Sequence, residues 1–256
     1  MAAPVPDLVL VPGFMQRADA WRAVAEIVAP RYPVHCLDLH ERDFARRLDE
    51  IAAATPRGGA LAGYSMGGRL ALHLAVGSRA DLGALVLVGA SAGIEDATER
   101  SARRRSDAEL ADWMERHPIE EVVDRWERSP VFGSQSASLR ESQRPGRLSH
   151  DPAALAVLLR SAGQGARPPI WDRLEDVGCP VLAIAGERDP AYAAAAARIA
   201  SLTPRGEARV VGGAGHAPQL EDPEQFAGLL LDFLDEHLGK RRVVDDDPEP
   251  GPLGHG

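Results

Sequence analysis

The chain has 256 residues, of which 45% are hydrophobic and 26% charged, as in ordinary water-soluble globular proteins. Its net charge of −9 argues against a nucleic-acid-binding protein, because no basic surface is available to neutralise phosphates. No apolar run approaches the roughly 18 residues of a membrane span, and the N-terminus lacks the basic segment of a signal peptide, so we expect a cytoplasmic protein.

Short apolar runs that end in turn residues alternate with longer amphipathic segments. In chain order, we predict a strand at 8–13, a helix at 17–29, a strand at 34–39, a helix at 42–54, a strand at 60–65, a helix at 67–79, strands at 84–90 and 181–186, a helix at 190–202, a strand at 208–213 and a helix at 222–238. Runs that are apolar on both faces are typical of parallel strands covered by helices. The alternation predicts an α/β fold with a doubly wound, mostly parallel sheet.

A long interval without a convincing strand separates the strands at 84–90 and 181–186. It contains predicted helices at 95–117, 119–128 and 151–163, with Pro118, Pro130, Pro145 and Gly146 between them. Ligands of parallel sheets bind outside the carboxyl ends of the strands, so an insertion here is placed to act as a cap. The predicted domains are an α/β core at 1–92 and 166–238, a helical cap at 93–165, and a disordered tail at 239–256 that is rich in charge, Pro and Gly.

The sequence Gly63-Tyr64-Ser65-Met66-Gly67 fits the G-x-S-x-G pattern of a nucleophile elbow. A predicted strand precedes it and a predicted helix follows it, which is the context that the pattern requires. The small residues on either side permit the sharp turn that exposes the serine above the sheet. Ser65 is therefore the candidate nucleophile, and it requires a histidine to activate it.

The partners of such a serine follow in the order acid, then histidine. His216 comes after the last predicted strand, at the same edge of the sheet as Ser65, and fits better than the other histidines, for example His73 within a helix, His35 in a strand, His237 near the C-terminus and His255 in the tail. Glu187 and Asp189 both follow the strand at 181–186. We expect Asp189, which lies further past the strand end, to orient His216, and Glu187 to be a solvated or arginine-paired side chain.

An oxyanion hole in this arrangement requires two backbone N–H groups. One is that of Met66, directly after the candidate nucleophile. The other is predicted in the loop after the first strand, at Phe14, because Pro12 has no N–H to donate.

At this point the chain resembles the α/β-hydrolase superfamily over nearly its whole length. Within it, the chain is similar to the 2-succinyl-6-hydroxy-2,4-cyclohexadiene-1-carboxylate synthases of menaquinone biosynthesis. The segments that carry this resemblance are GYSMGGRLAL (63–72), SAGIEDATERSARRRSD (91–107), DRWERSPVF (124–132), GRLSHDPAALAVLL (146–159) and GERD (186–189). The oxyanion loop of that family usually reads His-Gly, where this chain has Pro12-Gly13.

The resemblance implies a carbon–oxygen lyase that eliminates pyruvate from 2-succinyl-5-enolpyruvyl-6-hydroxy-3-cyclohexene-1-carboxylate. Arginine suits this small polyanionic substrate, because a guanidinium binds carboxylates bidentately. Arg69 lies four residues after Ser65 on the same helix face, so it can reach the same pocket. The resemblance adds four further substrate-binding candidates, which are Arg103, Arg147, Tyr64 and Trp126. The alternative for the arginines is pairing with the many acidic residues of the cap.

Ser65, Asp189 and His216 could also act as the catalytic residues of a carboxylesterase, a lactonase or a thioesterase. A further alternative is a non-catalytic binding protein of this fold, although such a protein usually lacks one of the three. No His, Cys and Asp cluster has metal-ligand spacing, so neither a metal nor a cofactor is expected. We expect no nucleic-acid or membrane partner, and a monomer or a weak homo-oligomer.

Overall fold

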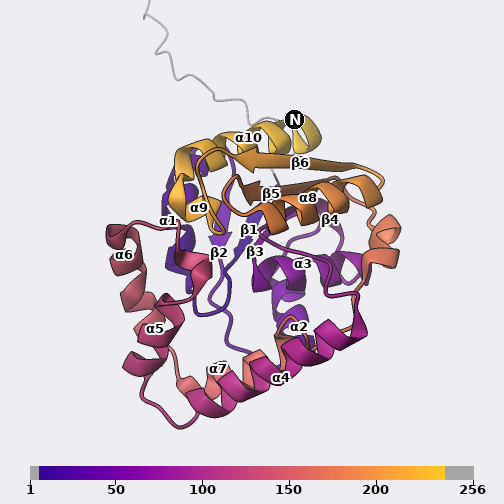
Figure 1. Cartoon of the computed structure of the whole chain (residues 1–256). Coiled ribbons are helices and arrows are strands. Elements are labelled where there is room, and N and C mark those ends of the chain that lie inside the picture. The colour runs from indigo at the N-terminus through magenta and orange to yellow at the C-terminus, as the bar shows by residue number, and fades with distance from the viewer. Residues whose placement is uncertain (1–5, 240–256) are drawn as a thin grey trace, which may run out of the picture.

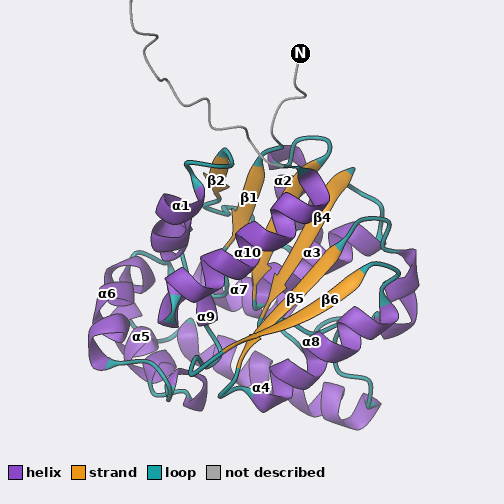
Figure 2. Cartoon of the chain, turned by 90° about the horizontal axis from the view of Figure 1, so that it is seen from above, coloured by secondary structure: helices purple, strands orange, loops and turns teal. Residues whose placement is uncertain are grey.

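The computed structural model describes residues 6–239, and the expected tail beyond Gly239 lies outside the described residues. Six strands form a single sheet in the order β2-β1-β3-β4-β5-β6, and every neighbouring pair is parallel (Figure 2). The strands are β1 (Leu8–Val11), β2 (Val34–Cys36), β3 (Gly59–Tyr64), β4 (Leu82–Val88), β5 (Val181–Gly186) and β6 (Gly206–Val211). The predicted α/β class with a parallel sheet covered by helices is confirmed.

Helices cover both faces of the sheet because the strands alternate buried side chains between two apolar clusters. Leu8 and Leu10 of β1 pack with α1 (Arg22–Val28) and α10 (Pro223–Leu238) on one face. Val9 and Val11 face the cluster on the other side, formed with α2 (Phe44–Ala54), α3 (Met66–Val76) and α8 (Pro190–Leu202). Two short helices, η1 (Ala18–Trp21) and α9 (Pro218–Glu221), were not predicted as separate elements.

Between β4 and β5 the described chain contains helices and no strand. These are α4 (Ala97–Met114), α5 (Ile119–Glu127), η2 (Pro130–Phe132), α6 (Ala137–Leu148), α7 (Pro152–Ala162) and η3 (Trp171–Asp176). Helices α4 to α7 fall inside the interval 93–165 that is expected as the cap, and Figure 1 shows them on the opposite side of the molecule from α10 and β6. They share a small apolar core that also takes in Met15 from the loop after β1.

Helix α6 was not predicted, because Pro145 and Gly146 were interpreted as a break between helices. The structure has Pro145 inside α6, where its ring leaves the carbonyl of Glu141 without the usual helical donor. Glu141 is exposed, so water can satisfy that carbonyl. The helix begins at a favourable cap, since the Ser136 hydroxyl accepts a hydrogen bond from the amide of Leu139.

No helix among residues 6–239 is long and apolar enough to cross a membrane.

Candidate active site

Ser65 occupies the sharp turn between β3 and α3. Its backbone has φ +50° and ψ −108°. Residues other than glycine rarely adopt this conformation, and where they do, the residue is often at a functional site. A Cβ on Gly63 would lie 2.5 Å from the carbonyl oxygen of Gly67, and one on Gly67 would lie 2.5 Å from that of Pro12. Both glycines are therefore required for the close approach of β3, α3 and the loop after β1.

The structure brings His216 and Asp189 to Ser65. His216 follows β6 and is buried, with Nδ1 2.7 Å from Asp189 Oδ2 and Nε2 3.3 Å from Ser65 Oγ. If Nδ1 donates to the carboxylate, Nε2 is left to accept the serine proton, which is the arrangement of a general base held by an acid. Asp189 stands at the end of β5 and also caps α8.

Glu187, the competing acid, points elsewhere. It is exposed, and its Oε2 accepts a hydrogen bond from the amide of Gly213 at 2.8 Å. The arrangement therefore favours Asp189 as the partner of His216.

Two backbone amides beside Ser65 are available to hold a negative oxygen. Within residues 6–239, the N–H groups of Phe14 and Met66 donate to no protein acceptor. The turn at Phe14 is held by Gln16, whose side-chain oxygen accepts from the amide of Gly13 at 3.0 Å. Gln16 is a residue that the sequence analysis missed, although its position three residues after the glycine is the spacing of a turn.

A cavity of about 240 Å³ opens above Ser65 and His216. Every substrate-binding and oxyanion candidate from the sequence lines it, namely Phe14, Tyr64, Met66, Arg69, Arg103, Trp126 and Arg147. Asp107, Tyr192 and Gln164 also line it and were not predicted. The cavity is thus lined both by residues of the segments that carry β1, β3 and α3 and by residues of the inserted helices α4 to α7.

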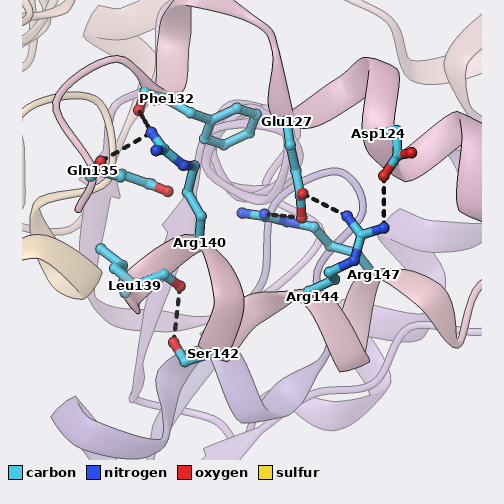
Figure 3. Close-up of polar contacts among 9 residues, drawn as sticks. All are labelled: Asp124, Glu127, Phe132, Gln135, Leu139, Arg140, Ser142, Arg144 and Arg147. Atoms are coloured by element: carbon cyan, nitrogen blue, oxygen red, sulfur yellow. Dashed lines mark hydrogen bonds and ion pairs between the residues drawn. The ribbon is translucent and has the colours of Figure 1, made fainter. Parts of the chain in front are cut away.

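Arg147 contributes a buried guanidinium that already has an ionic partner. Its side chain is 2% exposed and pairs with Glu127 at 2.7 Å, over the ring of Phe132. Glu127 also pairs with Arg144 at 2.7 Å, and Arg144 in turn with Asp124 (Figure 3). Figure 3 shows Arg144 and Arg147 directed from α6 toward the same carboxylate of α5. The alternative of a cap ion pair therefore applies to Arg147, which nevertheless lines the cavity.

Arg103 is also paired. Its Nε donates to Asp107 Oδ1 at 2.8 Å, one helical turn further along α4, and a terminal nitrogen donates to Gln164 at 2.8 Å. Asp107 is buried, and its second oxygen has no hydrogen-bond partner among the described residues. The i,i+4 spacing of Arg103 and Asp107 is a signal from which the pair could have been predicted.

Arg69 differs from the other two, because no carboxylate of residues 6–239 lies within ion-pair distance of it. One terminal nitrogen donates to the carbonyl oxygen of Ala162 in the cap at 2.9 Å. Burial lowers the pKa of Arg69 to about 10, so the group remains protonated at neutral pH. Arg69 is therefore a positive charge without a paired carboxylate, one turn of helix away from Ser65.

Aromatic rings form much of the remaining wall. Trp126 lies edge-on to both Phe14 and Phe132, with ring centroids 5.3 and 5.7 Å apart. Tyr64 and Tyr192 flank the ring of His216, at 5.5 and 4.5 Å between centroids, and burial raises the pKa of both phenols. Both tyrosines are therefore neutral hydrogen-bond donors and acceptors at physiological pH.

Elsewhere, the described residues contain one group with the donor types of a metal site. Glu207, Glu236 and His237 offer ligand atoms within 4.8 Å of one another. Glu207 is already paired with both His237 and Arg209, and this group does not line the cavity.

Comparison with known proteins places this geometry in a family. The model of the alpha/beta hydrolase family matches residues 8–229. A 2-succinyl-6-hydroxy-2,4-cyclohexadiene-1-carboxylate synthase of Klebsiella pneumoniae is 30% identical over 90% of this chain and 94% of its own length. A putative enzyme of the same name from Bacillus subtilis is 36% identical over 68% of this chain, but over only 65% of its own length.

Solved structures with a similar fold support the same family. MenH from S. aureus superposes with a TM-score of 0.85 at 28% identity, covering 92% of this chain and 96% of that one. An esterase from Thermogutta terrifontis, at 22% identity and a TM-score of 0.75, covers 93% of this chain and 92% of its own and shares the fold. The chain therefore belongs to the alpha/beta hydrolase family, in the group of the 2-succinyl-6-hydroxy-2,4-cyclohexadiene-1-carboxylate synthases.

Proposed function

We propose that this protein is a lyase that eliminates pyruvate from 2-succinyl-5-enolpyruvyl-6-hydroxy-3-cyclohexene-1-carboxylate. The observation that carries the proposal is the cavity in which Ser65 and His216 lie together with three guanidinium groups, one from the core and two from the cap. The names of the relatives support the same reaction. A neutral ester would gain little from such a wall, whereas a substrate with several carboxylates would be held by it.

The elimination needs a base and an acceptor for negative charge. His216, oriented by Asp189, takes the proton of Ser65, and the serine oxygen removes a proton from a carbon of the substrate. The charge moves onto a substrate carbonyl oxygen, which the amides of Met66 and Phe14 stabilise. The carbon–oxygen bond to the enolpyruvyl group then breaks, and the pyruvate enolate that leaves takes up a proton, which balances the one removed from carbon, to become pyruvate. No covalent intermediate on Ser65 is required.

The arginines hold the substrate so that the reacting carbon lies beside Ser65. Arg69 is the strongest candidate for a direct carboxylate contact, because it has no ionic partner among residues 6–239. Arg103 and Arg147 can share their charge with substrate while retaining Asp107 and Glu127. Trp126 would pack against the substrate ring. All of these residues come from one chain, so a monomer is sufficient.

The test is to incubate the purified protein with the enolpyruvyl substrate and, separately, with p-nitrophenyl acetate. We expect stoichiometric pyruvate release, lost in Ser65→Ala, and slow hydrolysis of the ester. Burst acylation by the ester without pyruvate release would contradict the lyase and favour a carboxylesterase, lactonase or thioesterase. A Ser65→Ala variant that retained full pyruvate release would contradict the role of the serine.

A further inference from the structure

A second cavity, of about 220 Å³, lies on the other side of the loop that carries the Phe14 amide. Its walls are that loop, the segment 39–47 of the core, and the segment 149–158 of the cap. Gln16 borders both cavities, whereas the Phe14 side chain faces only the first. The second cavity is thus a separate space at the junction of core and cap, and the proposed reaction does not use it.

Basic side chains dominate this second cavity. Its lining includes Arg17, Arg42, Arg47, His40 and His150, and Asp151 is the only acidic residue among the described residues that line it. Asp151 is 3.8 Å from Arg42, and both of these side chains are exposed. The more enclosed part of the cavity therefore carries an excess of positive charge.

Arg17 and Arg47 have no ion-pair partner within residues 6–239. Arg17 donates instead to the hydroxyl and carbonyl oxygens of Ser149, at 3.0 and 2.9 Å, and Arg47 donates to the carbonyl oxygen of Glu41. Burial and the neighbouring charge of Arg17 contribute to lowering the pKa of Arg47 to about 10. The charges of Glu50 and Glu41 act on this pKa in the opposite direction, although neither carboxylate pairs with Arg47.

The acidic residues of this neighbourhood form no ion pair with Arg17 or Arg47, and Glu41 lies instead 3.8 Å from Arg46. Asp38 accepts from the amide of Ala18 at 2.8 Å. Glu50 accepts from the amides of His40 and Glu41 at 2.8 and 3.2 Å. These carboxylates moderate the local potential, but none of them lines the cavity.

His150 adds a ring nitrogen that has no partner in the described chain and that can donate a hydrogen bond in the tautomer with its proton on Nε2. Its Nε2 atom is buried and has no hydrogen-bond partner among residues 6–239. Burial, Arg17 and Arg47 lower the pKa of His150 to about 4, so the ring is neutral at physiological pH. A buried polar atom without a partner is unfavourable, and an acceptor bound in the cavity would relieve that cost.

We propose that this second cavity binds a small oxyanion, through a carboxylate or phosphate group held by Arg17, Arg47 and His150. Both groups match the fork of donors that guanidinium presents. The cavity volume of about 220 Å³ leaves room for a small oxyanion. The site is independent of the proposed elimination, because Arg17, Arg47 and His150 do not line the first cavity.

The test uses NMR spectroscopy of isotopically labelled protein to follow the ring resonances of His150. These resonances are assigned by their absence in the His150→Gln variant. Sodium phosphate, succinate and pyruvate are titrated separately, with sodium chloride at matched ionic strength as the control. We expect a saturable shift with at least one of the three anions and none with chloride. The anion that binds most tightly distinguishes a phosphate group from a carboxylate.

Variants locate the binding. Arg47→Gln and, separately, Arg17→Gln are expected to weaken binding at least tenfold, and either one suffices if the other fails to fold. Arg46→Gln is the matched control, because Arg46 is the neighbouring residue on α2 and its side chain is 74% exposed. Arg69→Gln, which removes a charge from the first cavity, should leave the His150 response unchanged.

Three results would overturn the proposal: an equal response to chloride, unchanged binding in the folded Arg47→Gln or Arg17→Gln variant, or loss of the response in Arg69→Gln. The last would place the anion in the first cavity. None of these results bears on pyruvate release, so the proposed lyase activity stands or falls separately.

Discussion

Replacing Arg69 by methionine separates substrate binding from folding. Arg69 has no carboxylate partner within residues 6–239, so a substrate carboxylate would be its first ionic contact. A hydrogen bond to a charged group contributes about 1.5–3 kcal/mol, and about 1.4 kcal/mol is a factor of ten. We therefore expect Arg69→Met to lower kcat/KM for the enolpyruvyl substrate by about 10- to 150-fold. The Coulomb energy of about 4 kcal/mol for charges ~4 Å apart at an effective dielectric of ~20 sets the upper limit, near a thousandfold.

The same substitution should not destabilise the fold. Burial of the unpaired charge lowers the pKa of Arg69, which means that the fold disfavours its charged form. The free energy of unfolding of Arg69→Met is therefore expected to equal or exceed that of the parent. Arg147→Met is the contrasting variant, because it removes one partner of a buried ion pair. Such a loss typically costs about 3–5 kcal/mol, and we expect about 1–3 kcal/mol here because Arg144 still pairs with Glu127.

The assay is steady-state pyruvate release together with urea denaturation of both variants, and p-nitrophenyl acetate serves as the neutral substrate. The ester rate of Arg69→Met should remain close to that of the parent. The reasoning would be refuted if kcat/KM for the anionic substrate stayed within twofold, if the ester rate fell in parallel, or if Arg69→Met lost more stability than Arg147→Met.

The remaining predictions concern the elbow and the pH dependence of stability. Ser65→Gly should be more stable than Ser65→Ala by about 1 kcal/mol in urea denaturation, because glycine tolerates φ +50°; equal stability would show that the turn is unstrained. Gly67→Ala should destabilise by several kcal/mol, since its Cβ would meet the Pro12 carbonyl, whereas Gly228→Ala in α10 has open space and should stabilise slightly. Burial and two nearby arginines lower the pKa of His73 to about 4, so the unfolded chain binds more protons between about pH 6.5 and 4. The free energy of unfolding should fall as the pH falls through this window, by up to about 3 kcal/mol from His73, and His73→Leu should flatten the measured profile.

Local sequence signals predicted the elements with sharp boundaries. The predicted strand at 181–186 and helix at 190–202 coincide with β5 and α8, because Asp189 caps the helix and Pro190 takes its first position. Helix α6 was missed for the opposite reason, since Pro145 is usually a helix boundary. The helix continues through Pro145 because the carbonyl of Glu141 is exposed and water can bind it. Exposure depends on how the whole molecule packs, so the local sequence does not predict it.

In the candidate site, too, some residues have local sequence signals and others depend on tertiary contacts. Ser65 has a local signature, and the order of strands places Asp189 and His216 near it, so all three could be predicted. The pairing of Arg147 with Glu127 could not, because the two residues are twenty positions apart and meet only through the packing of α5 against α6. The sequence shows how many arginines there are, but their partners depend on tertiary contacts.

Whether an arginine of the cavity is paired with a carboxylate determines how it can bind a substrate. A guanidinium that is already paired adds little net charge to the cavity, and binding substrate there means sharing or exchanging an existing partner. An unpaired guanidinium has been desolvated without an ionic partner, so a ligand that neutralises it recovers part of that cost as affinity. Arg69 is in the second condition, and it stands on the helix that begins at the candidate nucleophile. In the proposed reaction, helix α3 thus supplies both the reacting group and a charge that selects the substrate, while Arg103 and Arg147, held by Asp107 and Glu127, shape the opposite wall.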